Sequence, residues 1–173
     1  MKELILGGVR SGKRRLAEQR ARDSGLQVLY IATAIAAGDS ELEERVRQHR
    51  ARRPATWTVV EEPLALGDAL RAHASLQRCL VVECLTLWLT NLLCTAPDRL
   101  ERERLSLLGS MPALAGDIIL VSNETGLGVV PLGVLSRRFV DASGELHQSL
   151  AAMCDRVTLA VAGLPFLLKG THT

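Results

Sequence analysis

The sequence is poor in aromatic side chains: 3% of its 173 residues are Phe, Trp or Tyr, although 47% are hydrophobic. A core of this composition must be built from Leu, Val, Ile and Ala, as is common in α/β proteins. The length fits one domain with enough apolar sequence for a sizeable core. We therefore expect residues 1–173 to form a single domain.

The sequence also lacks the marks of secreted, membrane-spanning and nucleic-acid-binding proteins. Its four cysteines form no Cys-x-x-Cys pair, and no apolar run approaches the roughly 20 residues of a membrane-spanning helix. A formal net charge of +2 is too small to indicate binding to nucleic acid or to a membrane surface. A strand-like segment follows Met1 in place of a signal peptide. We therefore expect a cytoplasmic protein with reduced thiols, no nucleic-acid partner and no membrane span.

Short apolar runs alternate with helical patterns, which is typical of βαβ units and a mostly parallel sheet. Strands buried on both faces have almost continuous apolar sequences. We expect such strands at residues 4–6, 27–33, 79–84, 117–122 and 156–161, a weaker one at 56–60, and an antiparallel edge strand at 165–169. Helical patterns cover residues 13–22, 42–52, 64–73, 86–93, 99–114 and 133–150, the last with a candidate break at 141–144.

A phosphate-binding pattern follows the first expected strand. Residues 7–14 read Gly-Gly-Val-Arg-Ser-Gly-Lys-Arg and match G-x-x-x-x-G-K. A strand before the loop and a helix behind it would direct backbone N–H groups and the helix dipole at an anion. Lys13 would contact the terminal phosphates, and the loop itself would consist of Gly7, Gly8, Val9, Arg10, Ser11 and Gly12. The alternative is a glycine-rich turn followed by a lysine by chance.

Arg14 departs from this pattern, which has Ser or Thr after the lysine as a ligand of Mg²⁺. A guanidinium group has no lone pair with which to ligate a metal. The sequence leaves three explanations open. Carboxylates and water hold Mg²⁺, or Arg14 supplies positive charge in its place, or phosphoryl transfer is weakened.

A second basic segment surrounds His49. Ser40 and Glu43 have the spacing of a capping box, which predicts a helix beginning near residue 41. His49 follows Leu42 by seven residues, on the apolar stripe of that helix. The neighbouring arginines are Arg45, Arg47, Arg50, Arg52 and Arg53. They suit a polyphosphate and would keep the imidazole neutral for attack on phosphorus. A structural histidine beside solvated arginines explains the same pattern.

Acidic residues stand where two expected strands end. Glu83 ends one strand at the edge where parallel sheets bind ligands, so it is a candidate for holding Mg²⁺ or a nucleotide. An ion pair with a nearby arginine is the alternative for Glu83. Asn123 and Glu124 follow the next strand, and residues 126–128 (Gly-Leu-Gly) predict a substrate or subunit-contact loop. Glu61 and its neighbour Glu62 form a weaker acidic pair.

These stretches together resemble the bifunctional adenosylcobinamide kinase/adenosylcobinamide-phosphate guanylyltransferase family of cobalamin biosynthesis, over nearly the whole chain. The matching stretches are residues 7–13 (GGVRSGK), 28–34 (VLYIATA), 45–50 (RVRQHR), 53–57 (RPATW), 83–86 (ECLT), 90–93 (TNLL) and 122–131 (SNETGLGVVP). The resemblance implies a P-loop NTPase-like α/β fold with a mostly parallel mixed sheet, an antiparallel C-terminal edge strand and helices on both faces. It also implies a homotrimer.

The resemblance implies two activities. ATP or GTP phosphorylates adenosylcobinamide, and GTP then guanylylates adenosylcobinamide phosphate through a guanylyl-histidine at His49, with Mg²⁺ as the metal. The corrinoid is thus the expected small-molecule partner. Nucleotide contacts of the family fall on residues 7–13 and Arg14, Ala32, Thr33, Ala34, Arg50, Ala51, Arg52, Arg53, Glu61 and Glu83, with Glu83 also the candidate metal ligand.

The sequence departs from the family at Gln48, where members can carry a second histidine, and at Arg14. Two other functions fit the motifs: a P-loop small-molecule kinase of another type, without a covalent histidine, and a nucleotide-binding regulator without catalysis.

Overall fold

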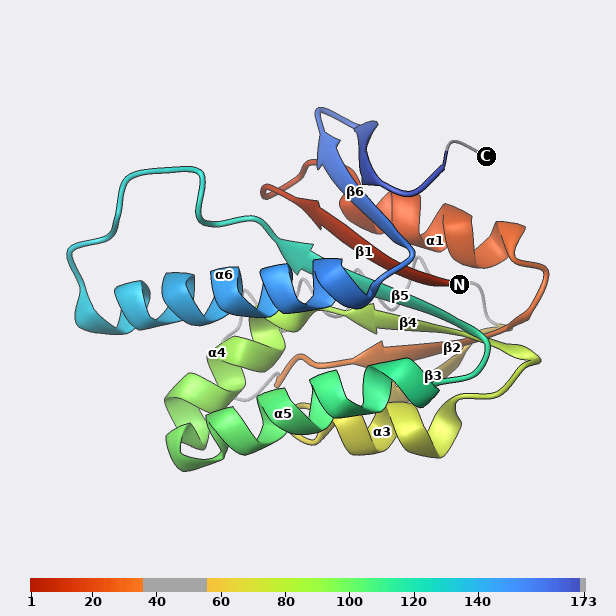
Figure 1. Cartoon of the computed structure of the whole chain (residues 1–173), viewed down its shortest axis with the longest axis horizontal. Coiled ribbons are helices and arrows are strands. Elements are labelled where there is room, and N and C mark those ends of the chain that lie inside the picture. Colours follow the sequence, from red (N-terminus) through yellow and green to blue (C-terminus); the bar gives the residue numbers. More distant parts are fainter. Residues whose placement is uncertain (36–55, 172–173) are drawn as a thin grey trace.

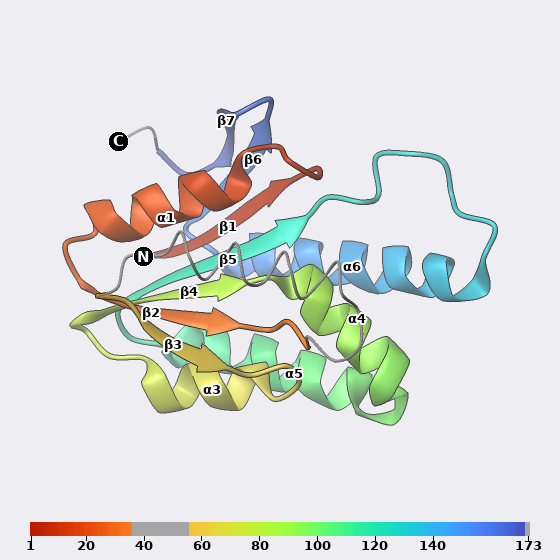
Figure 2. The same ribbon diagram turned by 180° about the vertical axis from the view of Figure 1, so that it is seen from behind.

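A computed structural model describes residues 1–35 and 56–171 of the chain (Figures 1 and 2). The strands are β1 (Lys2–Gly7), β2 (Gln27–Ala32), β3 (Thr58–Glu61), β4 (Arg78–Glu83), β5 (Asp117–Asn123), β6 (Arg156–Val161) and β7 (Leu164–Lys169). The α-helices are α1 (Lys13–Asp23), α3 (Leu66–His73), α4 (Leu85–Thr95), α5 (Leu100–Ser110) and α6 (Val134–Met153). Two 3₁₀ turns are η1 (Pro97–Arg99) and η2 (Met111–Ala113).

All seven of these strands join one sheet, in the order β3-β2-β4-β5-β1-β6-β7. Every neighbouring pair is parallel except β6 and β7, which pair antiparallel at one edge. The predicted mixed sheet with an antiparallel C-terminal edge strand is therefore confirmed. The weaker predicted strand at 56–60 is β3, which begins two residues later and includes Glu61.

Helices cover both faces of the sheet, as predicted. Figure 1 shows α3, α4, α5 and α6 on one face, and the reverse view in Figure 2 shows α1 on the other. The side chains of successive strand residues alternate between the two faces. In β1, Leu4 and Leu6 pack with the larger group of helices, while Ile5 packs with Ala17 and Ala21 of α1. This double burial explains the continuous apolar runs.

Two helix predictions need correction. The candidate break at 141–144 is wrong, because α6 continues without interruption through Gly144. Leu146 and Leu150 on this helix are fully buried, and their burial outweighs the cost of about 1 kcal/mol for a glycine in a helix interior. The predicted helix at 99–114 ends as an α-helix at Ser110 and continues as the 3₁₀ turn that contains Pro112.

The predicted helix at 42–52 lies outside the described residues. None of the helices in the two described segments has the length and apolar character needed to cross a membrane.

Helices α3 and α5 approach each other closely at Gly67, which is buried in α3. A Cβ atom added at Gly67 would lie 2.6 Å from the Ser106 Oγ and 2.7 Å from the Ser106 carbonyl carbon. Backbone atoms at this distance cannot give way as a flexible side chain would. Glycine at this position therefore sets the spacing of the two helices.

We expect Gly67→Ala to lower the free energy of unfolding by about 1–3 kcal/mol, because the added methyl group overpacks this contact. Gly109→Ala is the matched control: Gly109 also lies in a helix, but a Cβ atom there would meet nothing within 4 Å. That change should raise stability by about 0.5–1 kcal/mol. Urea unfolding followed by circular dichroism measures both, and equal effects of the two changes would contradict the argument.

Candidate nucleotide-binding site

The loop between β1 and α1 has the geometry of an anion-binding site. It leaves the carboxyl edge of the sheet after Gly7 and enters α1 at Lys13. Gly12 precedes the helix with a φ of 91°, a backbone conformation that favours glycine. The first turn of α1 contains no acidic residue, and its N-cap residue, Gly12, provides no side-chain cap. The N–H groups and the dipole at this helix end are therefore available to an anion.

The turn between β6 and β7 packs against this loop. The backbone N–H of Gly163 donates to the Ser11 carbonyl at 2.9 Å. A Cβ atom on Gly12 would lie 2.9 Å from the Gly163 Cα, so the two backbones meet without side chains between them. The Ser11 hydroxyl is buried and has no hydrogen-bond partner within the described segments. The β6–β7 turn thus supports the loop, and the Ser11 hydroxyl inside it remains free to bind a ligand.

Lys13 folds back onto the loop in this structure. Its Nζ donates to the Gly8 carbonyl at 2.9 Å. Burial lowers the pKa of Lys13, and the charges of Cys84 and Glu83 act in the opposite direction. A triphosphate would offer this ammonium group charged acceptors in place of a carbonyl, and hydrogen bonds between charged groups are about twice as strong as neutral ones.

Arg14 points to the carboxylates next to the loop. Its Nε lies 3.2 Å from Glu83 Oε2 and 3.1 Å from Glu18 Oε1, and its Nη2 donates to the Tyr30 hydroxyl at 3.2 Å. Tyr30 in turn donates to Glu83 Oε2 at 2.7 Å. The guanidinium also lies over the Tyr30 ring, 5.9 Å from its centroid. The alternative for Glu83, an ion pair with a nearby arginine, is the arrangement that the structure shows.

The residues that would hold Mg²⁺ in a P-loop do not fit that role here. Arg14 stands where the hydroxyl ligand belongs, and Glu83 already accepts from Tyr30 and pairs with Arg14. In the described segments, no three side chains among His, Cys, Asp and Glu converge as a metal site. The prediction that Glu83 ligates Mg²⁺ therefore finds no support in the geometry of the site.

Ala32, Glu61 and Glu83, three of the predicted nucleotide contacts, lie side by side at the carboxyl edge of the sheet. Ala32 of β2 pairs with Glu83 of β4 on one side and with Glu61 of β3 on the other. Thr33 follows them but is fully buried, and its hydroxyl donates to the Cys84 carbonyl at 2.8 Å and accepts from the Cys84 N–H at 2.9 Å. Thr33 thus fixes the backbone after Glu83. Ala34 follows at the same edge, half-buried.

His49, Arg50, Ala51, Arg52 and Arg53 lie outside the described residues, so their contacts stay predictions. Sequence reasoning missed Glu18 and Tyr30, the partners of Arg14. The Glu18 contact had a signal, because residues four apart share one side of a helix. The contact of Tyr30 with Arg14 had no sequence signal, apart from the polar hydroxyl of Tyr30 in a largely apolar strand.

A buried polar cluster joins β5 to α6 beside the loop. His147 Nε2 lies 2.8 Å from the Ser122 hydroxyl, and His147 Nδ1 lies 3.7 Å from Glu124 Oε2. The Glu124 N–H donates to the Gly7 carbonyl at 3.0 Å, and its Oε1 accepts from the Gly126 N–H at 2.6 Å. Burial lowers the pKa of His147, while the Glu124 carboxylate acts in the opposite direction. A neutral His147 therefore supports the start of the β5–α6 loop.

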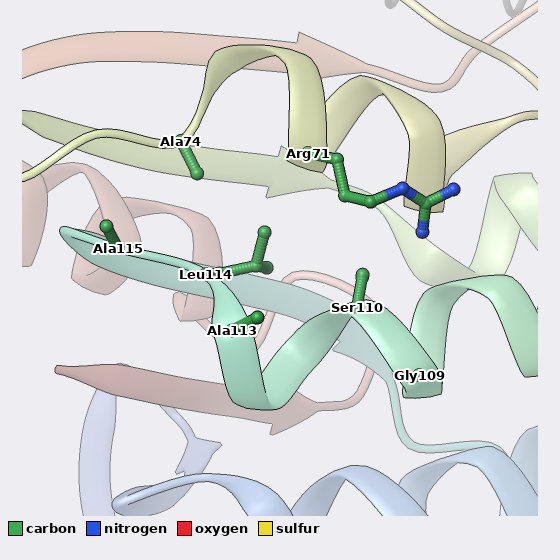
Figure 3. A pocket seen from close by; sticks show the side chains of 7 residues that line it. All are labelled: Arg71, Ala74, Gly109, Ser110, Ala113, Leu114 and Ala115. Atoms are coloured by element: carbon green, nitrogen blue, oxygen red, sulfur yellow. The ribbon is translucent and has the colours of Figure 1, made fainter.

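Figure 3 shows a hollow between α3 and α5. Its lining residues are Arg71, Ala74, Gly109, Ser110, Ala113, Leu114 and Ala115. Ala74 and Ala115 precede β4 and β5, so the hollow lies at the amino edge of the sheet, opposite the loop. Arg71, the charged group in it, already pairs with Asp68 and donates to the Ser106 carbonyl at 3.2 Å. We do not assign the corrinoid or the nucleotide to it.

Comparison with known proteins gives the same family from independent matches. Residues 3–168 match the family described as cobinamide kinase / cobinamide phosphate guanyltransferase. The sequence is 64% identical over 171 residues to the bifunctional adenosylcobalamin biosynthesis protein CobP of Pseudomonas aeruginosa, covering 98% of each chain. It is 36% identical over 180 residues to the bifunctional adenosylcobalamin biosynthesis protein CobU of Escherichia coli, covering 96% of this chain and 98% of that one.

Solved structures with a similar fold have little sequence identity. The flagellar accessory protein FlaH of Methanocaldococcus jannaschii is 13% identical with a TM-score of 0.52, covering 99% of this chain and 81% of that one. The P4 protein of bacteriophage phi6, in complex with ADP, is 13% identical with a TM-score of 0.51, covering 95% and 53%. These likenesses concern the fold alone and agree with the predicted P-loop NTPase-like class.

The buried His147 predicts a loss of stability in mild acid. The unfolded chain takes up a proton at this residue below about pH 6.5, whereas the native protein does so only at lower pH. The free energy of unfolding should therefore fall as pH drops from 6.5 towards the native pKa, by at most about 1.4 kcal/mol per pH unit from this group.

His147→Gln should remove that component, measured as the difference between the unfolding free energies of the two proteins from pH 7.5 to 5. The half-buried His73 at the end of α3 gives the control substitution His73→Gln. A pH dependence unchanged by His147→Gln would show that His147 does not titrate differently in the two states.

Proposed function

The chain belongs to the cobinamide kinase / cobinamide phosphate guanyltransferase family, and we propose that its single domain, residues 1–173, performs both reactions. It is a transferase of adenosylcobalamin biosynthesis. The observation that carries the proposal is the loop at residues 7–13, which offers an uncapped helix end and Lys13 to a triphosphate, in a chain that matches the family over residues 3–168.

In the kinase reaction, a hydroxyl oxygen of adenosylcobinamide attacks the γ-phosphorus of ATP or GTP. The bond from that phosphorus to the bridging oxygen breaks, the nucleoside diphosphate leaves, and the proton of the attacking hydroxyl passes to solvent. Lys13 and the loop N–H groups hold the phosphates and stabilise the charge that develops on their oxygens. The step needs positioning and electrostatic stabilisation more than covalent chemistry by the protein.

In the guanylyltransferase reaction, an imidazole nitrogen of His49 attacks the α-phosphorus of GTP and pyrophosphate leaves. A phosphate oxygen of adenosylcobinamide phosphate then attacks the same phosphorus, so that GMP is transferred and His49 is regenerated. Histidine suits this route because it attacks as a neutral nitrogen and leaves readily once protonated. The basic residues Arg50, Arg52 and Arg53 beside His49 in the sequence support a role near the triphosphate.

GTP labelled at its α-phosphate or at its γ-phosphate separates this proposal from the alternatives. A P-loop kinase without a covalent histidine would transfer label from the γ-position only. A nucleotide-binding regulator would bind GTP and turn over neither adenosylcobinamide nor its phosphate. Label from the α-phosphate on the protein is expected only for the guanylyltransferase.

We also propose that the protein acts as a cytoplasmic homotrimer. All four cysteines are free, which suits a reducing compartment where nucleoside triphosphates are abundant. The loop between β5 and α6 projects from the body of the protein in both views and carries the exposed side chains of Leu127, Val129 and Leu132 (Figures 1 and 2). The edge strand β7 exposes Phe166 and Leu168. A closed ring needs two different surfaces that meet head to tail, and these two apolar surfaces supply them.

His49→Ala should abolish the adduct that appears by intact-mass measurement after incubation with GTP and Mg²⁺, while GTP affinity changes by less than about tenfold. The nucleophile is lost, but the phosphate loop is intact. Lys13→Ala is the contrasting variant, because loss of a direct charge contact should weaken GTP binding itself. An adduct that persists in His49→Ala, or an unchanged affinity in Lys13→Ala, would contradict the assigned roles.

The trimer proposal predicts that Val129→Ser with Leu132→Ser lowers the mass of the particle measured by light scattering after size exclusion. The control pair Leu76→Ser and Leu105→Ser changes exposed leucines elsewhere on the surface and should leave the mass unchanged. Trimers in both variants would show that the β5–α6 loop is not part of the interface. A monomeric wild-type protein would overturn the trimer itself.

A further inference from the structure

We propose that Arg14 takes the place of a metal ion at Glu83, so that this site binds GTP without a divalent cation held by the protein. The inference rests on the proposed function in one respect, because it assumes that the loop at residues 7–13 binds a nucleotide. It goes beyond that function in stating how this chain neutralises the carboxylates beside the triphosphate.

Three elements fix the ion pair between Arg14 and Glu83. Arg14 comes from the first turn of α1, Tyr30 from β2 and Glu83 from the end of β4. The tyrosine hydroxyl bridges the pair, because it accepts from the guanidinium and donates to the same Glu83 oxygen that the guanidinium contacts. An ion pair held in this way loses little further side-chain entropy, unlike an exposed pair of long side chains.

Glu83 Oε2, which contacts both Arg14 and Tyr30, is therefore not available to a cation from solvent. The Arg14 and Glu83 side chains are only 19% and 16% exposed, so solvent screens their interaction weakly. Mg²⁺ requires near-octahedral geometry and gives up its water reluctantly. To ligate Glu83 Oε2 it would have to displace Arg14 and separate a partly buried guanidinium from one of its two carboxylate partners, which is unfavourable.

Replacement of Arg14 by a neutral residue would favour a metal ion beside Glu83. Glu18 and Glu83 both place an oxygen within 3.2 Å of the same Arg14 nitrogen. Without the guanidinium, these two carboxylates would face each other near a triphosphate that is itself strongly negative. A divalent cation would then be needed to offset the repulsion.

The Arg14 guanidinium also keeps one donor unused. Its Nη1 is out of contact with solvent and has no hydrogen-bond partner within the described segments. A buried donor without an acceptor is unfavourable, and a bound anion is the kind of group that satisfies it. A phosphate oxygen could accept a hydrogen bond from Arg14 Nη1, whereas a metal ion could not.

The test is the affinity of the full chain for GTP, measured by calorimetry in EDTA and again in excess Mg²⁺. For the wild type we expect the two dissociation constants to agree within about threefold. For Arg14→Ser we expect GTP binding in EDTA to weaken by about tenfold or more and to recover when Mg²⁺ is added. Arg15→Ser is the matched control: it removes the same charge from the next residue, which is exposed, and should leave the metal dependence unchanged.

Mn²⁺ binding followed by electron paramagnetic resonance, without nucleotide, gives a second readout. Arg14→Ser should gain a bound Mn²⁺ that the wild type lacks. If Arg14→Ser does not fold, Glu83→Gln tests the same inference. A site in which Glu83 holds no metal should need no more Mg²⁺ for GTP binding after this change.

A wild-type affinity for GTP that falls tenfold in EDTA, or a Glu83→Gln protein that needs more Mg²⁺ for GTP binding, would overturn the inference. A wild type that binds no GTP under either condition would instead overturn the proposed function, and the Mn²⁺ comparison would still decide the role of Arg14.

Discussion

The parallel pairing of β1 with β5 on one side and β6 on the other is the constraint on which the candidate site depends. In this register Gly7 lies opposite Asn123 and opposite Ala160. A Cβ atom on Gly7 would collide with the Ser11 hydroxyl and the Ala160 carbonyl, so only glycine allows the chain to turn into the loop here. The pairing thereby brings the phosphate loop, the polar end of β5 and the last hairpin together at one edge.

The charges at that edge follow from the same arrangement. Parallel strands collect their carboxyl ends at one side, where Glu61 and Glu83 flank Ala32. The helix that begins behind the loop faces them with Lys13 and Arg14. A polyphosphate site has to balance carboxylates, cations and incoming anions, and in this chain a guanidinium pairs with one of the carboxylates at that edge. Membership of the transferase family defines the reactions, while the geometry describes how this member arranges its charges.

Much of the fold could be predicted from the sequence, because strands such as β4 and β5 are buried on both faces and have continuous apolar runs. The loop was also predictable, since its glycines and Lys13 follow a strand directly. What could not be predicted involves residues that meet only after folding. Arg14 and Glu83 are 69 positions apart, and the contact of His147 with Ser122 joins a helix to a strand. The break expected at Gly144 did not form because the burial of α6 outweighs local propensity. Local sequence gives no measure of that burial.

The contact between Gly163 and the phosphate loop has a consequence for the order of synthesis. The loop, at residues 7–13, leaves the ribosome well before the turn that contacts it, which is made some 150 residues later. At about 5–20 residues per second, the nascent loop waits many seconds for its support. A ribosome-bound chain truncated before β6 would thus carry the whole phosphate-binding motif without the backbone contact that shapes it. Nucleotide binding during translation would report the emergence of the β6–β7 hairpin.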